Sequence, residues 1–190
     1  AAAGDIVSDG AVTITSGSGT TTSGDSTTTS DTIQFASATT LGGAVALAST
    51  NGAVTFASTL DGAQNLTITA GTGNVTFNGA VGGTTRLGTL NIVRANNVTA
   101  SALTLGAFDQ DAGSGTTTFG GAVNTNTSAG VVVANTNLAV NAGVTTTSSG
   151  VVTFTQSGTT AIAAAGDIVS DGAVTITSGS GTTTSGDITT

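Results

Sequence analysis

Short runs of alternating apolar and polar residues recur along the whole chain, as in Val12-Thr13-Ile14 and Val54-Thr55-Phe56. Alternation with a period of two is typical of a strand that buries one face and exposes the other. The runs are separated by Gly, Asn, Ser and Asp, the residues that favour tight turns. Helices are not favoured, because Thr, Val, Gly, Ser and Asn are poor helix formers and no 3.6-residue apolar stripe is sustained. The pattern therefore predicts an all-β protein.

The apolar residue at the end of these runs returns at a constant 21-residue spacing. We expect the residues with this spacing to form one buried core row, which consists of Ile14, Phe35, Phe56, Phe77, Val98, Phe119 and Val140. From Val140 the row reaches Ile176, its last predicted member, through either Ile162 or Phe154. Either route takes one 22-residue step and one 14-residue step, in opposite order, and the sequence leaves both routes open.

A much longer repeat is superimposed on this spacing. Residues 1–25 recur without a change at residues 163–187, with a 162-residue offset. Residues 1–162 are therefore interpreted as one complete repeat unit, and residues 163–190 as the start of the next copy in a single continuous solenoid. Polar positions are copied as faithfully as apolar ones, so we expect the parent protein to be a tandem array. The 21-residue spacing divides one unit into about eight turns, seven full and one short.

Equal 21-residue steps predict a parallel β-solenoid, in which each turn stacks on the previous one and the same position faces the same interior row. The rings of Phe35, Phe56 and Phe77 are then expected to stack along the axis. Three short strands per turn predict a three-sided coil, and the lack of the hexapeptide rhythm of left-handed β-helices favours the right-handed form. Eight turns at about 4.8 Å each would advance about 38 Å per unit.

The composition excludes most catalytic chemistry. The 190 residues include no Cys, His or Lys, so neither a Ser-His-Asp or Cys-His nucleophile nor an ordinary zinc site can be built. We therefore expect no enzyme, no catalytic residue and no cofactor. A net charge of −8 argues against nucleic acid as a partner. The sequence contains no run of 18 apolar residues, so membrane insertion is not expected. The two cations, Arg86 and Arg94, fall in one turn and are expected to pair with carboxylates or backbone carbonyls.

Three sets of polar residues are candidate sites. Asp109 and Asp111 have the spacing of a partial calcium loop, but the third ligand and the distal Glu are missing, so a solvated corner is favoured and no metal site is predicted. Asp5 and Asp9, copied as Asp167 and Asp171, are interpreted as turn initiators, with contacts to ions or to other subunits as the less favoured alternative. Thr13 and Thr15 form a Thr-x-Thr pair of the kind that binds ice, but the predicted register breaks this array in five of six turns.

The runs at residues 52–73 and 73–99, GAVTFASTLDGAQNLTITAGTG and GNVTFNGAVGGTTRLGTLNIVRANNVT, resemble the repeat regions of large bacterial surface proteins of the filamentous-haemagglutinin and autotransporter-adhesin kind. The resemblance extends over nearly the whole chain and rests on composition and rhythm. It implies secretion across an outer membrane, a long right-handed β-helix, and a role in adhesion or in a matrix.

The leading functional hypothesis is a structural extracellular fibre or stalk at the cell surface, whose partners are further copies of the same repeat. An uncapped turn would be a bare sheet edge, so the array must continue, be capped or stack end to end. The alternative is an adhesin region that binds glycans or surfaces. An ice-binding protein and a polysaccharide-degrading β-helix are less favoured, the latter because the ten Asp are scattered along the chain.

Overall fold

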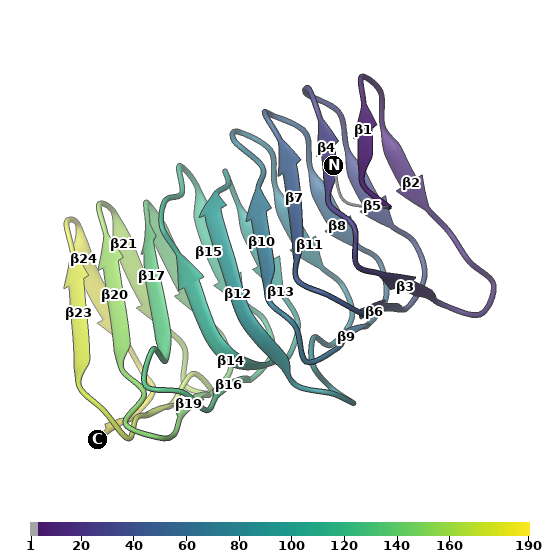
Figure 1. The fold of residues 1–190 in the computed structure, drawn as a ribbon. Coiled ribbons are helices and arrows are strands. Elements are labelled where there is room, and N and C mark those ends of the chain that lie inside the picture. Colours follow the sequence, from purple (N-terminus) through teal and green to yellow (C-terminus); the bar gives the residue numbers. More distant parts are fainter. Residues whose placement is uncertain (1–3) are drawn as a thin grey trace.

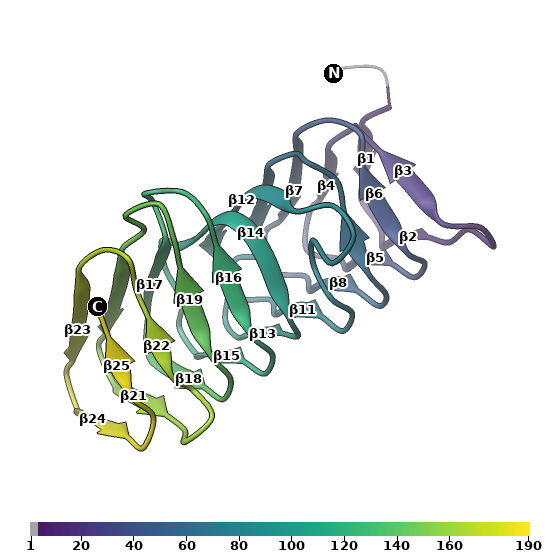
Figure 2. The same ribbon diagram turned by 90° about the horizontal axis from the view of Figure 1, so that it is seen from below.

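The computed structural model describes residues 4–190, which wind into a coil of nine turns with three sides to each turn (Figures 1 and 2). Strands pair in parallel with the equivalent strands one turn away. The first three residues of the repeated segment 1–25 lie outside the described residues. The predicted all-β, three-sided parallel β-solenoid is thereby confirmed.

Side one crosses Figure 1 as a ladder of strands. Its strands are β1 (Ile6–Ser8), β4 (Ser26–Thr28), β7 (Val45–Ser49), β10 (Leu66–Thr69), the C-terminal halves of β12 (Leu87–Arg94) and β14 (Leu103–Gln110), β17 (Val131–Asn135), β20 (Val152–Gln156) and β23 (Val174–Ser178).

Side two is a nine-stranded sheet. It consists of β2 (Val12–Ile14), β5 (Ile33–Phe35), β8 (Val54–Phe56), β11 (Val75–Phe77), β13 (Val98–Ala100), β15 (Thr116–Phe119), β18 (Asn137–Val140), β21 (Thr159–Ile162) and β24 (Gly181–Thr184).

Side three begins with a short sheet and continues through bridges at Val81 into the N-terminal half of β14. Its strands are β3 (Thr20–Thr22), β6 (Thr39–Leu41), β9 (Leu60–Asp61), the first residues of β14, β16 (Val123–Thr125), β19 (Val144–Thr146), β22 (Ile168–Val169) and β25 (Ile188–Thr189). The long strands β12 and β14 turn the corner from side three to side one.

The predicted phenylalanine stack lies on the inner face of side two. Phe35 pairs with Phe56 in register, and Phe56 with Phe77. The ring centroids of Phe35 and Phe56 are 4.7 Å apart with an interplanar angle of 6°, and those of Phe56 and Phe77 are 5.4 Å apart at 8°. All three side chains are fully buried. The stack therefore runs along the coil axis, as parallel in-register strands require.

The predicted core row is wrong at Val98. Val98 is buried but pairs with Val75, and Ala100 takes the place above Phe77. The step from Phe77 to Ala100 is thus longer than the regular 21-residue step, and the next, from Ala100 to Phe119, is correspondingly shorter. The eight-residue strands β12 and β14, which run through the corner from side three to side one, precede β13 and β15 in these two turns. The rest of the row, from Ile14 to Phe77 and from Phe119 to Val140, has the predicted register.

The predicted row is also wrong at Ile176, which lies on side one and pairs with Phe154. On side two the row continues from Val140 to Ile162 and then to Thr184. Each of the two open routes was therefore half right. The 22-residue steps, Val140 to Ile162 and Phe154 to Ile176, join neighbouring turns, and the 14-residue steps cross from one side to another.

Some corners require glycine because the next turn approaches the backbone closely. Gly71 has φ +60°, and a Cβ on it would lie 1.6 Å from the carbonyl oxygen of Thr50. Gly130 has φ +61°, and a Cβ there would lie 1.9 Å from the carbonyl oxygen of Val151. At these two corners any side chain would clash with the backbone of the neighbouring turn, so glycine lets adjacent turns stack at strand spacing.

Candidate functional site

Polar side chains line the inside of the corner between sides one and two in the C-terminal half of the coil. We call this set the corner ladder; it consists of Gln110, Thr117, Asn135, Gln156, Thr160 and Ser178. The Thr117 hydroxyl donates to Gln110 Oε1 at 2.6 Å, and the Thr160 hydroxyl donates to Gln156 Oε1 at 2.8 Å. A buried amide is costly unless it is hydrogen-bonded, so these contacts allow the apolar interior to end in a polar corner.

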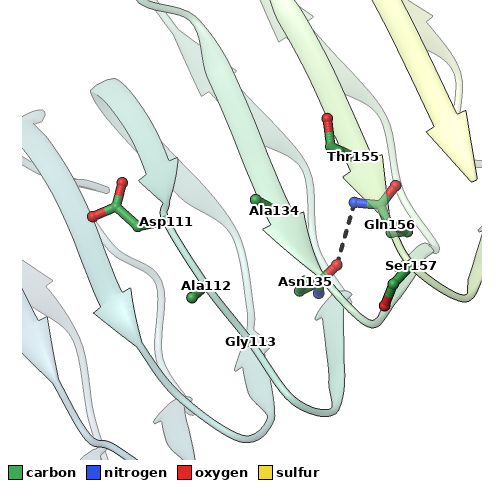
Figure 3. Close-up of a pocket in the computed structure, with 8 residues that line it drawn as sticks. All are labelled: Asp111, Ala112, Gly113, Ala134, Asn135, Thr155, Gln156 and Ser157. Carbon is green, nitrogen blue, oxygen red and sulfur yellow. Dashed lines mark hydrogen bonds between the residues drawn. The ribbon is translucent and has the colours of Figure 1, made fainter.

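The corner ladder also joins successive turns. Figure 3 shows Asn135 and Gln156 facing each other from neighbouring strands, where Gln156 Nε2 donates to Asn135 Oδ1 at 3.2 Å. The same Nε2 donates to the carbonyl oxygen of Val133 at 3.0 Å. Asn135 Nδ2 in turn donates to the carbonyl oxygen of Asn137 at 2.7 Å. An open depression on the outside of this corner is lined by Asp111, Ala112, Gly113, Ala134, Asn135, Thr155, Gln156 and Ser157 (Figure 3).

In the predicted partial calcium loop, the residue between the two carboxylates faces the interior of the coil. Gln110 points inward and is fully buried, while Asp109 is partly exposed beside Asn91 and Val132, and Asp111 is exposed. Burial and, to a lesser extent, the neighbouring Asp111 raise the pKa of the Asp109 carboxyl above 3.8. Within residues 4–190 no three His, Cys, Asp or Glu side chains gather closely enough to hold a metal ion.

Asp and Asn side chains on the outer corners accept hydrogen bonds from the next turn. We call them axial acceptors. Asp5 Oδ1 accepts the backbone N–H of Asp25 at 3.0 Å, and Asp25 Oδ1 accepts that of Ala46 at 2.7 Å. Asn65 and Asn137 do the same for Thr89 and Thr159. These carboxylates and amides therefore link turns along the axis, and for Asp5 this role goes beyond its interpretation as a turn initiator.

Asp9 also contacts the next turn, since its Oδ1 accepts the hydroxyl of Thr29 at 3.0 Å. The signal in the sequence that could have revealed the axial acceptors is the Asp or Asn that stands directly before many of the strands, as in Gly24-Asp25 and Gly73-Asn74. Backbone N–H groups of the turn above need acceptors where the ladder is interrupted at a corner.

Arg86 fastens side three in the middle of the coil. Its Nη1 donates to the carbonyl oxygens of Leu105 at 2.6 Å and Asn124 at 3.1 Å, and its Nη2 donates to Asn124 Oδ1 at 2.6 Å. The expected pairing with backbone carbonyls is thus confirmed for Arg86. Arg94 instead lines a second open depression, together with Thr50, Asn51, Thr69, Gly71 and Thr72.

The outward threonines of side two form a single column. Its register differs from the predicted one, because Thr99 and not Asn97 lies beside Thr76. Four consecutive turns therefore carry threonine, at Thr55, Thr76, Thr99 and Thr118. The positions two residues later in these turns are Ala57, Asn78, Ser101 and Gly120, so no second threonine column accompanies the first.

The end turns of the described coil expose sheet edges. Strands β1, β2 and β3 at one end, and β23, β24 and β25 at the other, each pair with a neighbour on one edge only. β24 is exposed along its whole length, and Ile188 in β25 is 44% exposed. Unpaired strand edges with apolar side chains are ready to pair with a further strand.

Comparison of the chain with family models, curated proteins and solved structures found no match. In the part of the chain that the structure describes, no helix has the length and apolar character needed to cross a membrane. What is established is the fold, a parallel β-solenoid of about nine turns.

Proposed function

We propose that the chain is part of a long, stiff extracellular fibre or stalk built from tandem copies of the 162-residue unit. The observation that carries this proposal is that the second copy continues the coil without a break: β22, β23 and β24 stack in register on β19, β20 and β21. A tandem solenoid extends by this addition of turns.

The mechanism of such a fibre is mechanical. Consecutive turns are joined by parallel backbone ladders on three sides, by rows of buried apolar side chains and by the axial acceptors. Each buried Val, Leu, Ile or Phe contributes roughly 1.5–3 kcal/mol, so the resistance to unwinding accumulates along the axis. Thr, Ser and Asn on the outer strand positions give the sides a polar, weakly charged surface.

The C-terminal turn is arranged to accept another turn. Asp25 accepts the backbone N–H of Ala46 from the turn that follows it. Its copy, Asp187, stands in the last described turn, with its own N–H bonded to Asp167 at 2.9 Å. In a longer array Asp187 would accept the N–H of the residue that corresponds to Ala46.

The resemblance to bacterial surface proteins of the filamentous-haemagglutinin and autotransporter-adhesin kind supports a place outside the cell. Such a fibre would act as a spacer that holds other domains away from the surface. Secretion is tested by fractionation of the source cells with antibody against the unit: the proposal expects the protein on the surface or in the medium, and a cytoplasmic pool alone would contradict it.

Electron microscopy of proteins with one, two and four tandem units tests the fibre directly. We expect rods whose length increases by about 37 Å per unit at constant width, because β22, the copy of β1, lies seven turns and two sides further along the coil and each turn advances about 4.8 Å. Rods that do not lengthen with the number of units would contradict the proposal.

Glycan binding is the second candidate function. The depression around Arg94 offers hydroxyl, amide and guanidinium groups on an exposed face, from Thr50, Asn51, Thr69 and Thr72. These groups hydrogen-bond sugar hydroxyls and acidic sugars. A glycan array probed with the chain and with the Arg94→Ala variant tests this function. Glycan binding that is lost in the variant would support an adhesin. If the chain binds no glycan, this second function is contradicted and the fibre remains the proposed function.

A further inference from the structure

The repeated segment occupies different sides of the coil in its two copies. In the first copy its successive strands β1, β2 and β3 lie on sides one, two and three. In the second copy the same sequence forms β22, β23 and β24, which lie on sides three, one and two. One 162-residue unit therefore spans seven turns and two sides, not a whole number of turns.

The two copies nevertheless share several local contacts. Ile6 pairs with Ser26, and their counterparts Ile168 and Ile188 pair with each other. The bond from Asp25 N–H to Asp5 Oδ1, 3.0 Å, recurs from Asp187 N–H to Asp167 Oδ1 at 2.9 Å. The bond from Gly10 N–H to Ser8 Oγ, 3.1 Å, recurs from Gly172 N–H to Ser170 Oγ at 3.3 Å. These contacts are thus kept although the segment lies on different sides of the coil in the two copies.

The surface that receives the second copy is well packed. Ile168 is fully buried above Val144, and Val174 lies above Val152. The Ser170 hydroxyl is 3.0 Å from that of Thr146 and donates to the carbonyl oxygen of Gly150 at 3.0 Å.

A hydrogen bond between Ser149 and Asp171 also joins the two units at the junction. Ser148 and Ser149 have φ values of 59° and 60°, and Asp171 Oδ2 accepts the Ser149 N–H at 2.8 Å. The counterpart of Asp171, Asp9, accepts the Thr29 hydroxyl instead. The end of one unit therefore meets the start of the next through apolar, hydroxyl and carboxylate contacts that suit the rotated placement.

We propose that successive units of the array are related by a rotation of one third of a turn, about 120°, so that the same face of the unit returns to one side only after three units. This inference rests on the tandem fibre proposed above and adds its internal symmetry. The partner that each junction binds is the N-terminal turn of the next copy, displaced by one side.

The rotation has two consequences for a fibre. Any bend within the unit would point in three directions in succession, and the bends of three units would offset one another. Any patch on the unit, such as the depression around Arg94, would be presented on all three sides. A straight rod that can be contacted from every direction follows from one repeated sequence.

Engineered disulfides test the placement of the second copy in the 190-residue chain, which has no cysteine of its own. Thr145 and Val169 are register partners across the junction, so the Thr145→Cys/Val169→Cys variant should oxidise fully. If a unit instead ended on a whole turn, with Ile176 above Ile162, Val169 would lie above Thr155. The pair Thr155→Cys/Val169→Cys should therefore not form a disulfide within one molecule.

Thr55→Cys/Thr76→Cys, a register pair far from the junction, is the positive control. Oxidation of the 155/169 pair, or failure of the 145/169 pair while the control oxidises, would overturn the rotation.

A six-unit array with Thr155→Cys in every unit, labelled with gold and viewed by cryo-electron tomography, tests the symmetry. Thr155 is exposed. We expect three rows of labels about 120° apart, with labels in one row about 110 Å apart, the rise of three units. A single row on a straight rod would overturn the rotation and leave the fibre standing. Globular particles without rods would overturn the fibre, while the disulfide result would still report the placement within one chain.

Discussion

The hydroxyl groups of Thr146 and Ser170 lie 3.0 Å apart in the buried corner where one repeat unit meets the next. Ser170 is the copy of Ser8, which lies at the N-terminal end of the coil and is only partly buried. The two copies of this serine, Ser8 and Ser170, thus lie in different environments, and their contributions to stability should differ.

Ser170→Ala should destabilise the coil by about 1 kcal/mol, because the bonds to Thr146 and Gly150 are lost inside the protein. Ser8→Ala is the matched control and should cost less, since its hydroxyl accepts one bond, from the exposed Gly10 N–H. Urea denaturation followed by circular dichroism measures both. Equal effects of the two substitutions would contradict the junction described here.

Phe56→Ala should destabilise by about 3–5 kcal/mol, because it leaves a cavity between two stacked rings in the interior. Phe56→Asp should melt the neighbouring turns, since it would bury an unpaired charge. Thr55→Ala, on the outer face of the same strand, is the control and should change the free energy of unfolding little. Unchanged stability of Phe56→Ala would mean that this row faces solvent.

Gly71→Ala should destabilise by more than about 1 kcal/mol, because the residue combines a left-handed backbone with a Cβ position 1.6 Å from the Thr50 oxygen. Gly83→Ala is the control, since its Cβ would meet only Ala80 at 3.5 Å, an ordinary contact distance. Chemical denaturation compares the two. If Gly71→Ala proves as mild as Gly83→Ala, the close approach of these turns is incorrect.

Asp109 should make the coil less stable as the pH rises. Burial and Asp111 raise the pKa of its carboxyl in the folded state above the ordinary value of 3.8, so the folded state holds this proton more tightly than the unfolded state. The stabilisation from the protonated form is present below pH 3.8 and is lost as the pH rises through the folded-state pKa.

Asp109→Asn should therefore gain stability relative to the native chain at pH 7 but not at pH 3, as measured by urea midpoints at the two values. Asp111→Asn should produce a smaller change of the same sign, because it removes only the lesser cause. A difference between native chain and Asp109→Asn that does not vary with pH would refute the shift.

The sequence was sufficient to predict the solenoid, its three sides and the stack of Phe35, Phe56 and Phe77, because in-register stacking makes the chain repeat the same residue type at the same interval. The displacement at Val98 could not be predicted in the same way. One turn is lengthened at a corner and the next is shortened to match, and both Val98 and Ala100 are apolar enough to face inward.

The placement of Ile176 failed for a different reason. The same sequence forms a strand on side two in the first copy and on side one in the second, so the repeated sequence alone does not indicate which side it takes. The corner ladder was missed because Gln110 and Gln156 are residue types that usually face solvent. Only the register of β14 and β20 brings them inside, next to Thr117 and Thr160.

A cryo-electron microscopy map of a multi-unit array would show both how successive units stack and whether the coil has the right-handed sense that the sequence favours. We predict a rod with parallel strands on three sides, turns spaced about 4.8 Å along the axis, and β22 of the second copy above β19 of the first. A map with antiparallel hairpins, or with units that form separate globular domains, would contradict the account.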